Sequence, residues 1–396
     1  MNKIFVTILA LLFATAGVMA SDSIPSGFSR PLAWRVVADV TAGCVPGTNG
    51  FVRGENPLDK RIGSYMSANV RADFSFDPST RQGMLYRGLY QGIGLGVNSF
   101  FAGDLLGTPV SAYVYQGAPI VRFNSRLWLG YEWQFGAAMG WKHNADESIN
   151  NNSPVSTSVT AYMGLDVKLH YQLADRWQMS LGVGARHFSN GNTSWPNPGV
   201  NAIVASVGLA YTINPFATGD GHPADAALAA EADHHEWFYD IMVYGAWRKR
   251  VVRVGDYDPQ LCPGRFGVLG LQFSPMYRLN RWVLVGPALD MQWDESAGLA
   301  PYWIDGTSGS FIKFFRPPVG RQLSAGLSAH AELTMPIFSV NAGLGYDFVT
   351  PRGDKRFYQS LTLKTFVSRN VYINTGYRLG DFKDPQNLML GIGVRL

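Results

Sequence analysis

Hydrophobic and polar residues alternate along most of the chain with a period of two. Between Leu127 and Lys142, leucine, tyrosine, tryptophan and phenylalanine occupy alternate positions, and mostly glycine, glutamate and glutamine lie between them. Successive side chains of a β-strand point to opposite faces, so this pattern predicts a strand with one apolar face. The same alternation recurs at residues 66–76, 323–333, 338–348 and 388–396. These strands are longer than the usual five or six residues.

The connections between the predicted strands are of two kinds. Very short turns lie at residues 124–126, 173–176, 279–281, 335–336 and 368–370, and longer polar loops lie at residues 142–156, 190–199, 294–320 and 350–355. Short connections at one end and long ones at the other are typical of outer-membrane barrels, and closure removes the strand edges that lipid cannot satisfy. We therefore predict an all-β fold, an antiparallel transmembrane β-barrel with short periplasmic turns and long extracellular loops.

About 16 strands are expected, with about 12 or 14 as alternatives, because boundaries carry errors of several residues. The predicted starts lie near Trp34, Tyr65, Leu89, Val110, Leu127, Ser158, Arg176, Val200, Trp237, Phe266, Trp282, Leu323, Ile337, Phe357, Val371 and Asn387. A linker at residues 214–236 separates a first half, residues 21–213, from a second half, residues 237–396. We favour one closed barrel. Two tandem eight-stranded barrels are the alternative, since barrels of that size are closed units.

The first 20 residues predict a secretory signal peptide. A short basic start at residues 1–3 precedes an apolar run, Ile4–Ala16, and the small residues at the end of Val18-Met19-Ala20 place the cleavage after Ala20. The apolar run is shorter than the roughly 20 residues that a spanning helix needs. Residues 21–396 then form the barrel.

Composition agrees with a surface that faces something other than water. Charged residues make up only 16% of the chain, against about a quarter in soluble domains, whereas hydrophobic residues make up 46%. The net charge of +4 is too slight to indicate a nucleic-acid partner. The sequence also predicts no cofactor and no metal site, because the Gly-x-Gly strings lie in strands rather than at the start of a helix.

Candidate chemistry lies at the end of one predicted strand. His187 and Ser189 continue the apolar register of the strand that begins at Arg176, so both should face lipid. Asn201 falls on the same side of the next strand. A nucleophile with a base in reach is the minimum for acyl transfer. The His-x-Ser spacing alone does not distinguish a catalytic pair from two polar residues at a membrane interface.

The surrounding residues form a longer motif. His187-Phe188-Ser189-Asn190-Gly191-Asn192 is followed by Pro196-Asn197-Pro198-Gly199-Val200-Asn201. This string resembles the signature of the lipid A 3-O-deacylases, PagL-type outer-membrane esterases, and of the broader acyloxyacyl hydrolase family. The whole chain is similar to the longer branch of that family, including its stretches at residues 90–94, 116–119, 291–296 and 387–391.

The resemblance implies hydrolysis of a fatty acyl ester of lipid A. Ser189 would be the nucleophile and His187 the general base. Asn197, with the backbone around Asn190 and Gly191, would bind the oxyanion. The resemblance also implies an outer-membrane location in a Gram-negative bacterium, with lipopolysaccharide of the outer leaflet as the partner.

One position departs from the family pattern. The glutamate of the PagL-type enzymes falls on Asn201 here. An amide can hold the histidine ring in orientation, but it carries no charge to stabilise the imidazolium. Asp146 and Glu147, in a neighbouring loop, are candidates to replace the acid. The departure keeps open a catalytically inactive barrel that binds lipopolysaccharide, and an outer-membrane channel is the other alternative.

Two further expectations concern charge and redox state. The phosphates of lipid A would favour cations at the outer end of the barrel. The candidates are Lys60, Arg61, Lys142, Arg186, Arg352 and Lys355, each of which is equally read as a solvated loop charge or a lumen residue.

Cys44 and Cys262 both fall in predicted outer loops, and whether they form a disulfide is left open.

Overall fold

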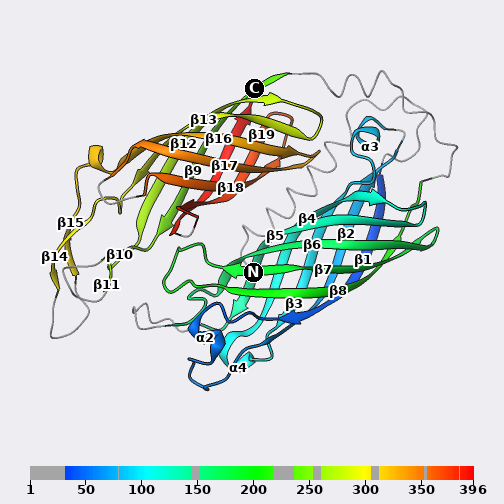
Figure 1. Cartoon of the computed structure of the whole chain (residues 1–396), viewed down its shortest axis with the longest axis horizontal. Coiled ribbons are helices and arrows are strands. Elements are labelled where there is room, and N and C mark those ends of the chain that lie inside the picture. The colour runs from blue at the N-terminus through cyan, green and yellow to red at the C-terminus, as the bar shows by residue number, and fades with distance from the viewer. Residues whose placement is uncertain are drawn as a thin grey trace. The chain divides into compact units, whose positions relative to one another are not determined.

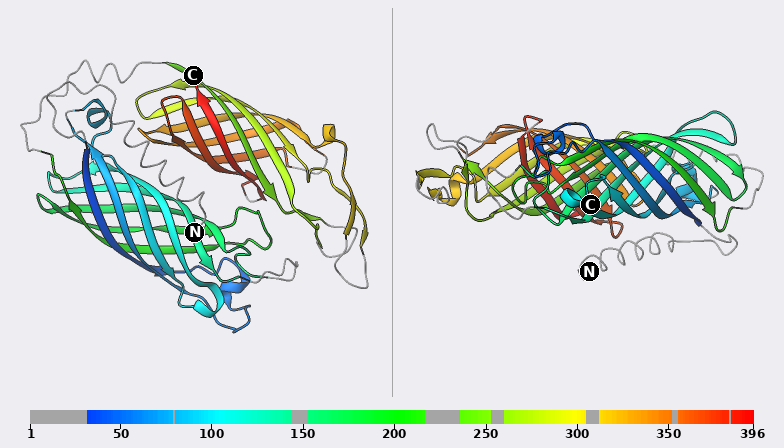
Figure 2. Two further views of the ribbon diagram at one scale, coloured as in Figure 1. Left: turned by 180° about the vertical axis from the view of Figure 1, so that it is seen from behind. Right: turned by 90° about the horizontal axis from the view of Figure 1, so that it is seen from below.

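The computed structural model describes residues 32–78, 80–143, 152–216, 236–252, 260–304, 312–351, 355–382 and 384–396. Strands dominate these ranges (Figures 1 and 2). Helices are short and lie in connections: α2 (Gly50–Arg53), α3 (Arg81–Leu85), α4 (Gly103–Leu106) and the 3-10 turn η1 (Val319–Arg321). Within the described ranges, no helix has the length and apolar character needed to cross a membrane.

The first half of the chain forms a closed antiparallel barrel of eight strands. They are β1 (Leu32–Cys44), β2 (Ser64–Phe76), β3 (Tyr90–Ser99), β4 (Gly107–Arg122), β5 (Leu127–Trp141), β6 (Val159–Ala174), β7 (Trp177–Ser189) and β8 (Val200–Thr212). Each strand pairs with its neighbour in sequence, and β1 pairs with β8 from Arg35↔Thr212 to Cys44↔Ile203. Figure 2 shows the tilt of these strands around the barrel.

The second half forms a second closed barrel of eight strands. They are β9 (Trp237–Arg248), β12 (Phe266–Arg278), β13 (Val283–Asp294), β16 (Leu323–Thr334), β17 (Phe338–Val349), β18 (Phe357–Phe366), β19 (Val371–Gly380) and β20 (Asp384–Arg395). Closure is between β9 and β20. Two small two-stranded sheets lie in its connections, β10 (Val251–Val252) with β11 (Gln260–Leu261), and β14 (Ala300–Ile304) with β15 (Ile312–Phe315).

The antiparallel all-β fold and the total of 16 barrel strands are confirmed within the described residues. The preference for a single closed barrel is wrong, because β1 pairs with β8 and β9 pairs with β20. The alternative of two eight-stranded barrels is the observed architecture. Alternation tells which side chains point into a lumen. It does not tell which two strands, far apart in sequence, close the sheet.

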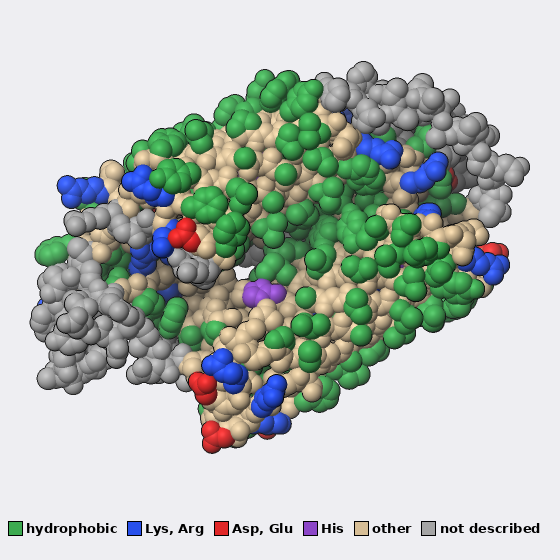
Figure 3. All heavy atoms as spheres, viewed as in Figure 1, with side chains coloured by type: hydrophobic (Ala, Val, Ile, Leu, Met, Phe, Trp, Pro, Cys, Tyr) green, Lys and Arg blue, Asp and Glu red, His purple; other side chains and the backbone are tan. Residues whose placement is uncertain are grey.

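The outer face of each barrel is apolar along its strands. On β8, the side chains of Ile203 and Val207 are 60% and 55% exposed, whereas those of Ala202 and Val204 are buried. Figure 3 shows hydrophobic side chains over the outer faces of the strands and charged side chains gathered toward their ends. This distribution matches a barrel whose outer face is solvated by lipid.

Ion pairs fill the lumen of the first barrel. The buried Glu132 carboxylate accepts hydrogen bonds from Arg71 and Lys168, each at 2.7 Å, and from Tyr90 at 3.0 Å. Arg71 also pairs with Asp39 at 2.7 Å. These groups come from β1, β2, β3, β5 and β6, so the network links strands around the barrel. A charge in a dry lumen is tolerated only when partners of this kind compensate it.

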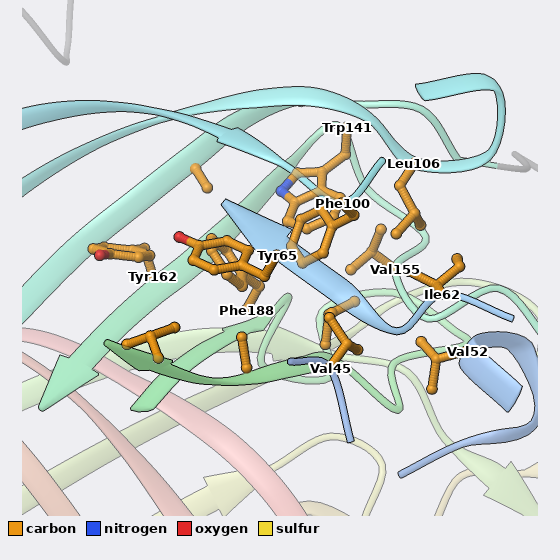
Figure 4. Packing of buried hydrophobic residues seen from close by; sticks show 14 of the residues in the cluster. Val45, Val52, Ile62, Tyr65, Phe100, Leu106, Trp141, Val155, Tyr162 and Phe188 are labelled. Atoms are coloured by element: carbon orange, nitrogen blue, oxygen red, sulfur yellow. The ribbon is translucent and has the colours of Figure 1, made fainter. Parts of the chain in front are cut away.

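Aromatic side chains close the end of the first barrel that carries its long loops. Tyr65, Phe100, Trp141 and Phe188 point toward one another (Figure 4). The ring centroid of Phe188 lies 5.7 Å from that of Phe100 and 5.3 Å from that of Trp141. Loop residues such as Val52, in α2, complete this apolar cluster. The filled lumen argues against a water-filled channel through the first barrel.

The second barrel has its own lumen network. Lys364 bonds to Asp240 and Glu332, each at 2.6 Å, and Arg395 bonds to the same two carboxylates at 2.7 Å. All four side chains are largely buried. In each barrel, the buried cationic and anionic side chains described above are paired with partners from the same barrel.

The two cysteines are not bonded to each other. Cys44 is exposed at the end of β1, and Cys262 is buried in the connection between β9 and β12, where burial raises the pKa of its thiol to about 11. The disulfide that the sequence left open is thus absent, and both thiols are free.

We predict that Glu132→Gln destabilises the first barrel by about 3 to 5 kcal/mol, because the neutral amide leaves Lys168 without this buried countercharge and leaves Arg71 with Asp39. Urea unfolding in detergent, followed by tryptophan fluorescence, measures this loss.

The matched control is Glu55→Gln, whose carboxylate pairs with Arg53 at 3.3 Å on the surface. Exposed pairs contribute about 0 to 1 kcal/mol, so this variant should unfold as the wild type does. Equal midpoints for the two variants would show that the Glu132 network does not hold the barrel together.

Candidate active site

The candidate site lies at the end of β7, on the outer face of the first barrel. Leu181 and Val183 on β7 are 47% and 63% exposed, and the alternation continues outward through Ala185 to His187 and Ser189, which are half-buried. Phe188, between them, is fully buried in the aromatic cluster. The predicted orientation is therefore observed: His187 and Ser189 share the outer face, while Phe188 anchors their strand end from inside.

Asn201 on β8 bonds directly to the histidine. His187 and Asn201 are register partners of β7 and β8, and His187 Nδ1 lies 2.7 Å from Asn201 Oδ1. An amide oxygen only accepts, so Nδ1 carries the hydrogen and the Nε2 atom keeps its lone pair. This is the tautomer in which Nε2 serves as a base.

The β7–β8 connection is shaped by glycine and asparagine. Gly191 and Asn192 have φ values of 63° and 64°, a left-handed conformation that these residue types tolerate. The buried Asn190 side chain donates to Ser156 Oγ at 2.9 Å and to the Ser194 carbonyl at 3.2 Å. Asn190 thus fastens this connection to the neighbouring β5–β6 loop.

Asn190 and Asn197 also bond to each other. The Asn190 backbone N–H donates to Asn197 Oδ1 at 2.8 Å. The Asn190 N–H is therefore occupied by this bond. Because Oδ1 of Asn197 faces this N–H, its Nδ2 group faces away and has no hydrogen-bond partner among the described residues.

Gly199 lies against both candidate catalytic side chains. Its φ is 72°, and a Cβ at this position would be 2.9 Å from the Phe188 carbonyl oxygen, 3.1 Å from His187 Cε1 and 3.5 Å from Ser189 Cβ. Its N–H donates to the Pro154 carbonyl at 2.9 Å, and its carbonyl accepts from Asn49 Nδ2 at 2.9 Å. The loops β1–β2 and β5–β6 thus hold Gly199 where only a glycine leaves the pair undisturbed.

The predicted cations that the structure describes lie in three kinds of surroundings. Arg186 points into the lumen, on the opposite face of β7 from His187, and bonds to Asp166 at 2.9 Å. It is therefore not a candidate for binding a lipid A phosphate. Lys60, Arg61 and Lys142 are exposed at the long-loop end of the first barrel. Lys355 pairs with Asp381 in the second barrel at 3.0 Å. Arg352, Asp146 and Glu147 lie outside the described residues.

Thr48 and Asn49, in the β1–β2 loop, were not identified from the sequence. Asn201 Nδ2 donates to Thr48 Oγ1 at 3.4 Å, and Asn49 bonds to Gly199. Both residues lie about 150 positions from their partners, and no local spacing connects them. Their only sequence signal is weak, since asparagine is a common N-cap and Asn49 caps α2.

A second serine–histidine–asparagine arrangement lies inside the second barrel. Ser328 Oγ is 2.8 Å from His330 Nε2, and His330 Nδ1 is 2.6 Å from Asn341 Oδ1. All three side chains are buried in the lumen, and the Ser328 hydroxyl also bonds to Asp290. This set belongs to the lumen network, and it provides an internal control for serine chemistry.

Among the described residues, no group of three or more potential metal ligands is found.

Three solved structures similar to this chain are distant from it in sequence. The TodX monoaromatic hydrocarbon channel deltaS2 mutant is 9% identical, over 93% of this chain and 90% of its own, with a TM-score of 0.19. A mutant Rh. blastica porin is 13% identical over 92% and 100%, with a TM-score of 0.16. The siderophore receptor PirA from Pseudomonas aeruginosa is 9% identical over 93% and 81%, with a TM-score of 0.23. Scores this low carry no argument about fold or function. No curated protein sequence matches the chain.

Family models match both halves of the chain. The model of lipid A 3-O-deacylase (PagL) matches residues 54–210, and that of the acyloxyacyl hydrolase C-terminal domain matches residues 237–396. The first match contains His187, Ser189 and Asn201. Since the two matches together cover most of the chain, this protein belongs to the PagL family of lipid A 3-O-deacylases, which is a family of carboxylic ester hydrolases.

Proposed function

We propose that this protein hydrolyses a fatty acyl ester of lipid A in the outer leaflet of a Gram-negative outer membrane. Ser189 is the nucleophile, His187 is the general base, and Asn201 orients the imidazole. The observation that carries this proposal is the His187–Asn201 hydrogen bond on the outer face of the first barrel, with Ser189 on the same face two residues away.

The chemistry follows from the tautomer. With Nδ1–H bonded to Asn201, the Nε2 lone pair of His187 removes the proton of the Ser189 hydroxyl as Oγ attacks the ester carbonyl. The tetrahedral intermediate then collapses, the ester C–O bond breaks, and the imidazolium gives its proton to the departing sugar oxygen, which leaves as a hydroxyl. Water, deprotonated by the same imidazole, hydrolyses the acyl-enzyme and releases the fatty acid.

Two donors are suited to the oxyanion that forms. Asn197 Nδ2 faces away from the Asn190 N–H, and the bond to that N–H holds the amide in place. The backbone N–H of Gly191 is the second candidate, since Gly191 lies two residues after Ser189, the last residue of β7. Preorganised donors of this kind stabilise developing charge without reorganisation.

The location of the site suits a substrate that stays in the membrane. The outer face below His187 is formed by apolar side chains such as Val183 and Ile203, along which an acyl chain would lie. The exposed Lys60 and Arg61 lie on the β1–β2 loop, which also bonds to Asn201 and Gly199 through Thr48 and Asn49. They are our candidates for pairing with the lipid A phosphates.

An inactive barrel that binds lipopolysaccharide is the second candidate function. The observation that favours it is the uncharged Asn201, since removal of the acid from a serine protease costs about 10⁴-fold in turnover. Replacement of the candidate nucleophile, Ser189, separates the two functions.

Ser189→Ala should abolish activity, with a loss of about a thousandfold or more, because the nucleophile is removed while the barrel is untouched. Mass spectrometry of lipid A from expressing cells should show loss of an acyl chain only with the wild type. A fluorophosphonate probe should label Ser189 in the purified wild-type protein.

The matched control for labelling is Ser328→Ala, which removes the buried lumen serine. This variant should be labelled as fully as the wild type, since Ser328 does not face the substrate side. Unmodified lipid A together with an unlabelled wild type would establish the inactive barrel instead.

Gly199→Ala should lower kcat/KM about a hundredfold while the barrel still folds. The added methyl would press on the Phe188 carbonyl oxygen and on His187 Cε1 and would strain a φ of 72°, and displacements of this size misalign reacting groups. Esterase assays on detergent-folded protein measure the effect. Gly103→Ala is the control, because a Cβ there meets nothing within 4 Å. Comparable activity of the two variants would contradict the contact role of Gly199.

Asn201→Glu should raise kcat, because a carboxylate stabilises the imidazolium as well as orienting the ring. The pH profile of kcat/KM, measured beside the wild type, checks this prediction. A fall in activity would mean that the site is built around an amide and does not accept the longer acid.

A further inference from the structure

Gly199, which lies against His187 and Ser189, cannot fix its own conformation. Glycine adopts positive and negative φ about equally, so its surroundings set the φ of 72° observed here. The peptide group before Gly199 donates its N–H to the Pro154 carbonyl at 2.9 Å, and the peptide group after it accepts, at the Gly199 carbonyl, from Asn49 Nδ2 at 2.9 Å. Together these two bonds hold both φ and ψ of the glycine.

The side chain of Asn49 has a single orientation that satisfies both of its partners. Its Oδ1 accepts from the Val52 N–H at 3.1 Å, while its Nδ2 donates to the Gly199 carbonyl. A backbone N–H only donates and a backbone carbonyl only accepts, so turning the amide would break both bonds. Asn49, the N-cap of α2, therefore links the first turn of that helix to Gly199.

Both loops that bond to Gly199 are anchored inside the barrel. Val52, three residues after Asn49, is 1% exposed, and Val155, next to Pro154, is fully buried. Both valines belong to the aromatic cluster that closes the lumen (Figure 4). A loop with such an anchor cannot shift without opening a close-packed cluster.

The same cluster contains Phe188, the residue between His187 and Ser189. The packed interior therefore supports the outer pair by two routes. One runs directly through the Phe188 side chain, and the other runs through the loops to Gly199, which lies on the opposite side of the strand end from the cluster.

We propose that Asn49 is a positioning residue that couples the aromatic cluster inside the lumen to the His187–Ser189 pair on the outer face, by holding Gly199 against that pair. This inference rests on the proposed function of Ser189 and His187. Asn49 bonds only to backbone groups of α2 and Gly199, so it acts on the reacting atoms through the glycine and not by contact.

Asn49→Asp separates the two bonds of this side chain. Aspartate caps a helix as well as asparagine does, so the Val52 N–H keeps its acceptor. A carboxylate cannot donate, so the Gly199 carbonyl loses its donor and faces a second acceptor instead. We expect kcat to fall about tenfold with KM little changed, since one hydrogen bond is lost and a repulsion is added. The rate of Ser189 labelling by a fluorophosphonate should fall in parallel.

The pH dependence separates positioning from a general loosening of the loop. A carboxyl group becomes protonated near about pH 4, and it can then donate to the Gly199 carbonyl again. The ratio of kcat in the Asn49→Asp variant to kcat in the wild type should therefore rise as the pH falls from about 8 toward about 4. Taking the ratio at each pH cancels the titration of His187, which both proteins share.

The inner end of the link is tested by Val52→Ala, which loosens α2 from the cluster. This change should lower kcat about threefold in the wild type and clearly less in the Asn49→Asp variant, where the link is already broken.

Asn124→Asp, in the β4–β5 turn, is the matched control for the change of charge. Asn124 Oδ1 accepts from the N–H groups of Arg126 and Leu127, each at 2.9 Å, and a carboxylate keeps both bonds. This variant should have the kcat and the pH profile of the wild type.

Three outcomes would overturn the inference: wild-type kcat in Asn49→Asp, a kcat ratio that stays constant across the pH range, or an equal loss from Val52→Ala with and without Asn49→Asp. None of them touches the proposed function, which fails separately if Ser189→Ala keeps full activity.

Discussion

Closure of two separate hydrogen-bonded ladders is the constraint on which the rest of this structure depends. Lipid offers no hydrogen bonds, so each strand must pair on both sides, and β1 with β8 and β9 with β20 complete the two rings. An eight-stranded ring is narrow enough for side chains to fill. The inward positions therefore carry residues that satisfy one another, such as Glu132 with Arg71 and Lys168.

The same closure places the candidate site. Once the lumen is filled, chemistry on a membrane substrate belongs to the outer face, and the period of two brings His187 and Ser189 there while Phe188 enters the core. The rigid strand pair β7–β8 sets the His187–Asn201 contact, and three loops adjust the surroundings through Thr48, Ser156 and Gly199. The strands thus fix the relative positions of His187 and Asn201, and the loops supply further hydrogen-bond partners.

The uncharged Asn201 changes how such a site works. Orientation of the histidine and stabilisation of its charge are separable tasks, and the amide can perform only the first. The buried His330–Asn341 pair in the second barrel shows the same hydrogen bond without an exposed serine. A histidine–asparagine contact is therefore not by itself a mark of catalysis. What distinguishes the outer site is access from the lipid side and the surrounding turn of glycine and asparagine.

The sequence by itself determined the sidedness of the strands, because alternation is local, and it therefore placed His187, Ser189 and Asn201 on one face. It also carried the motif that identifies the family. Tertiary structure decided which strands close each barrel, because the inward positions of a 16-stranded pore and of two eight-stranded barrels alternate in the same way. It likewise decided the contacts of Thr48 with Asn201 and of Asn190 with Asn197. Those contacts depend on loops brought together by closure, and no local pattern of residues encodes them.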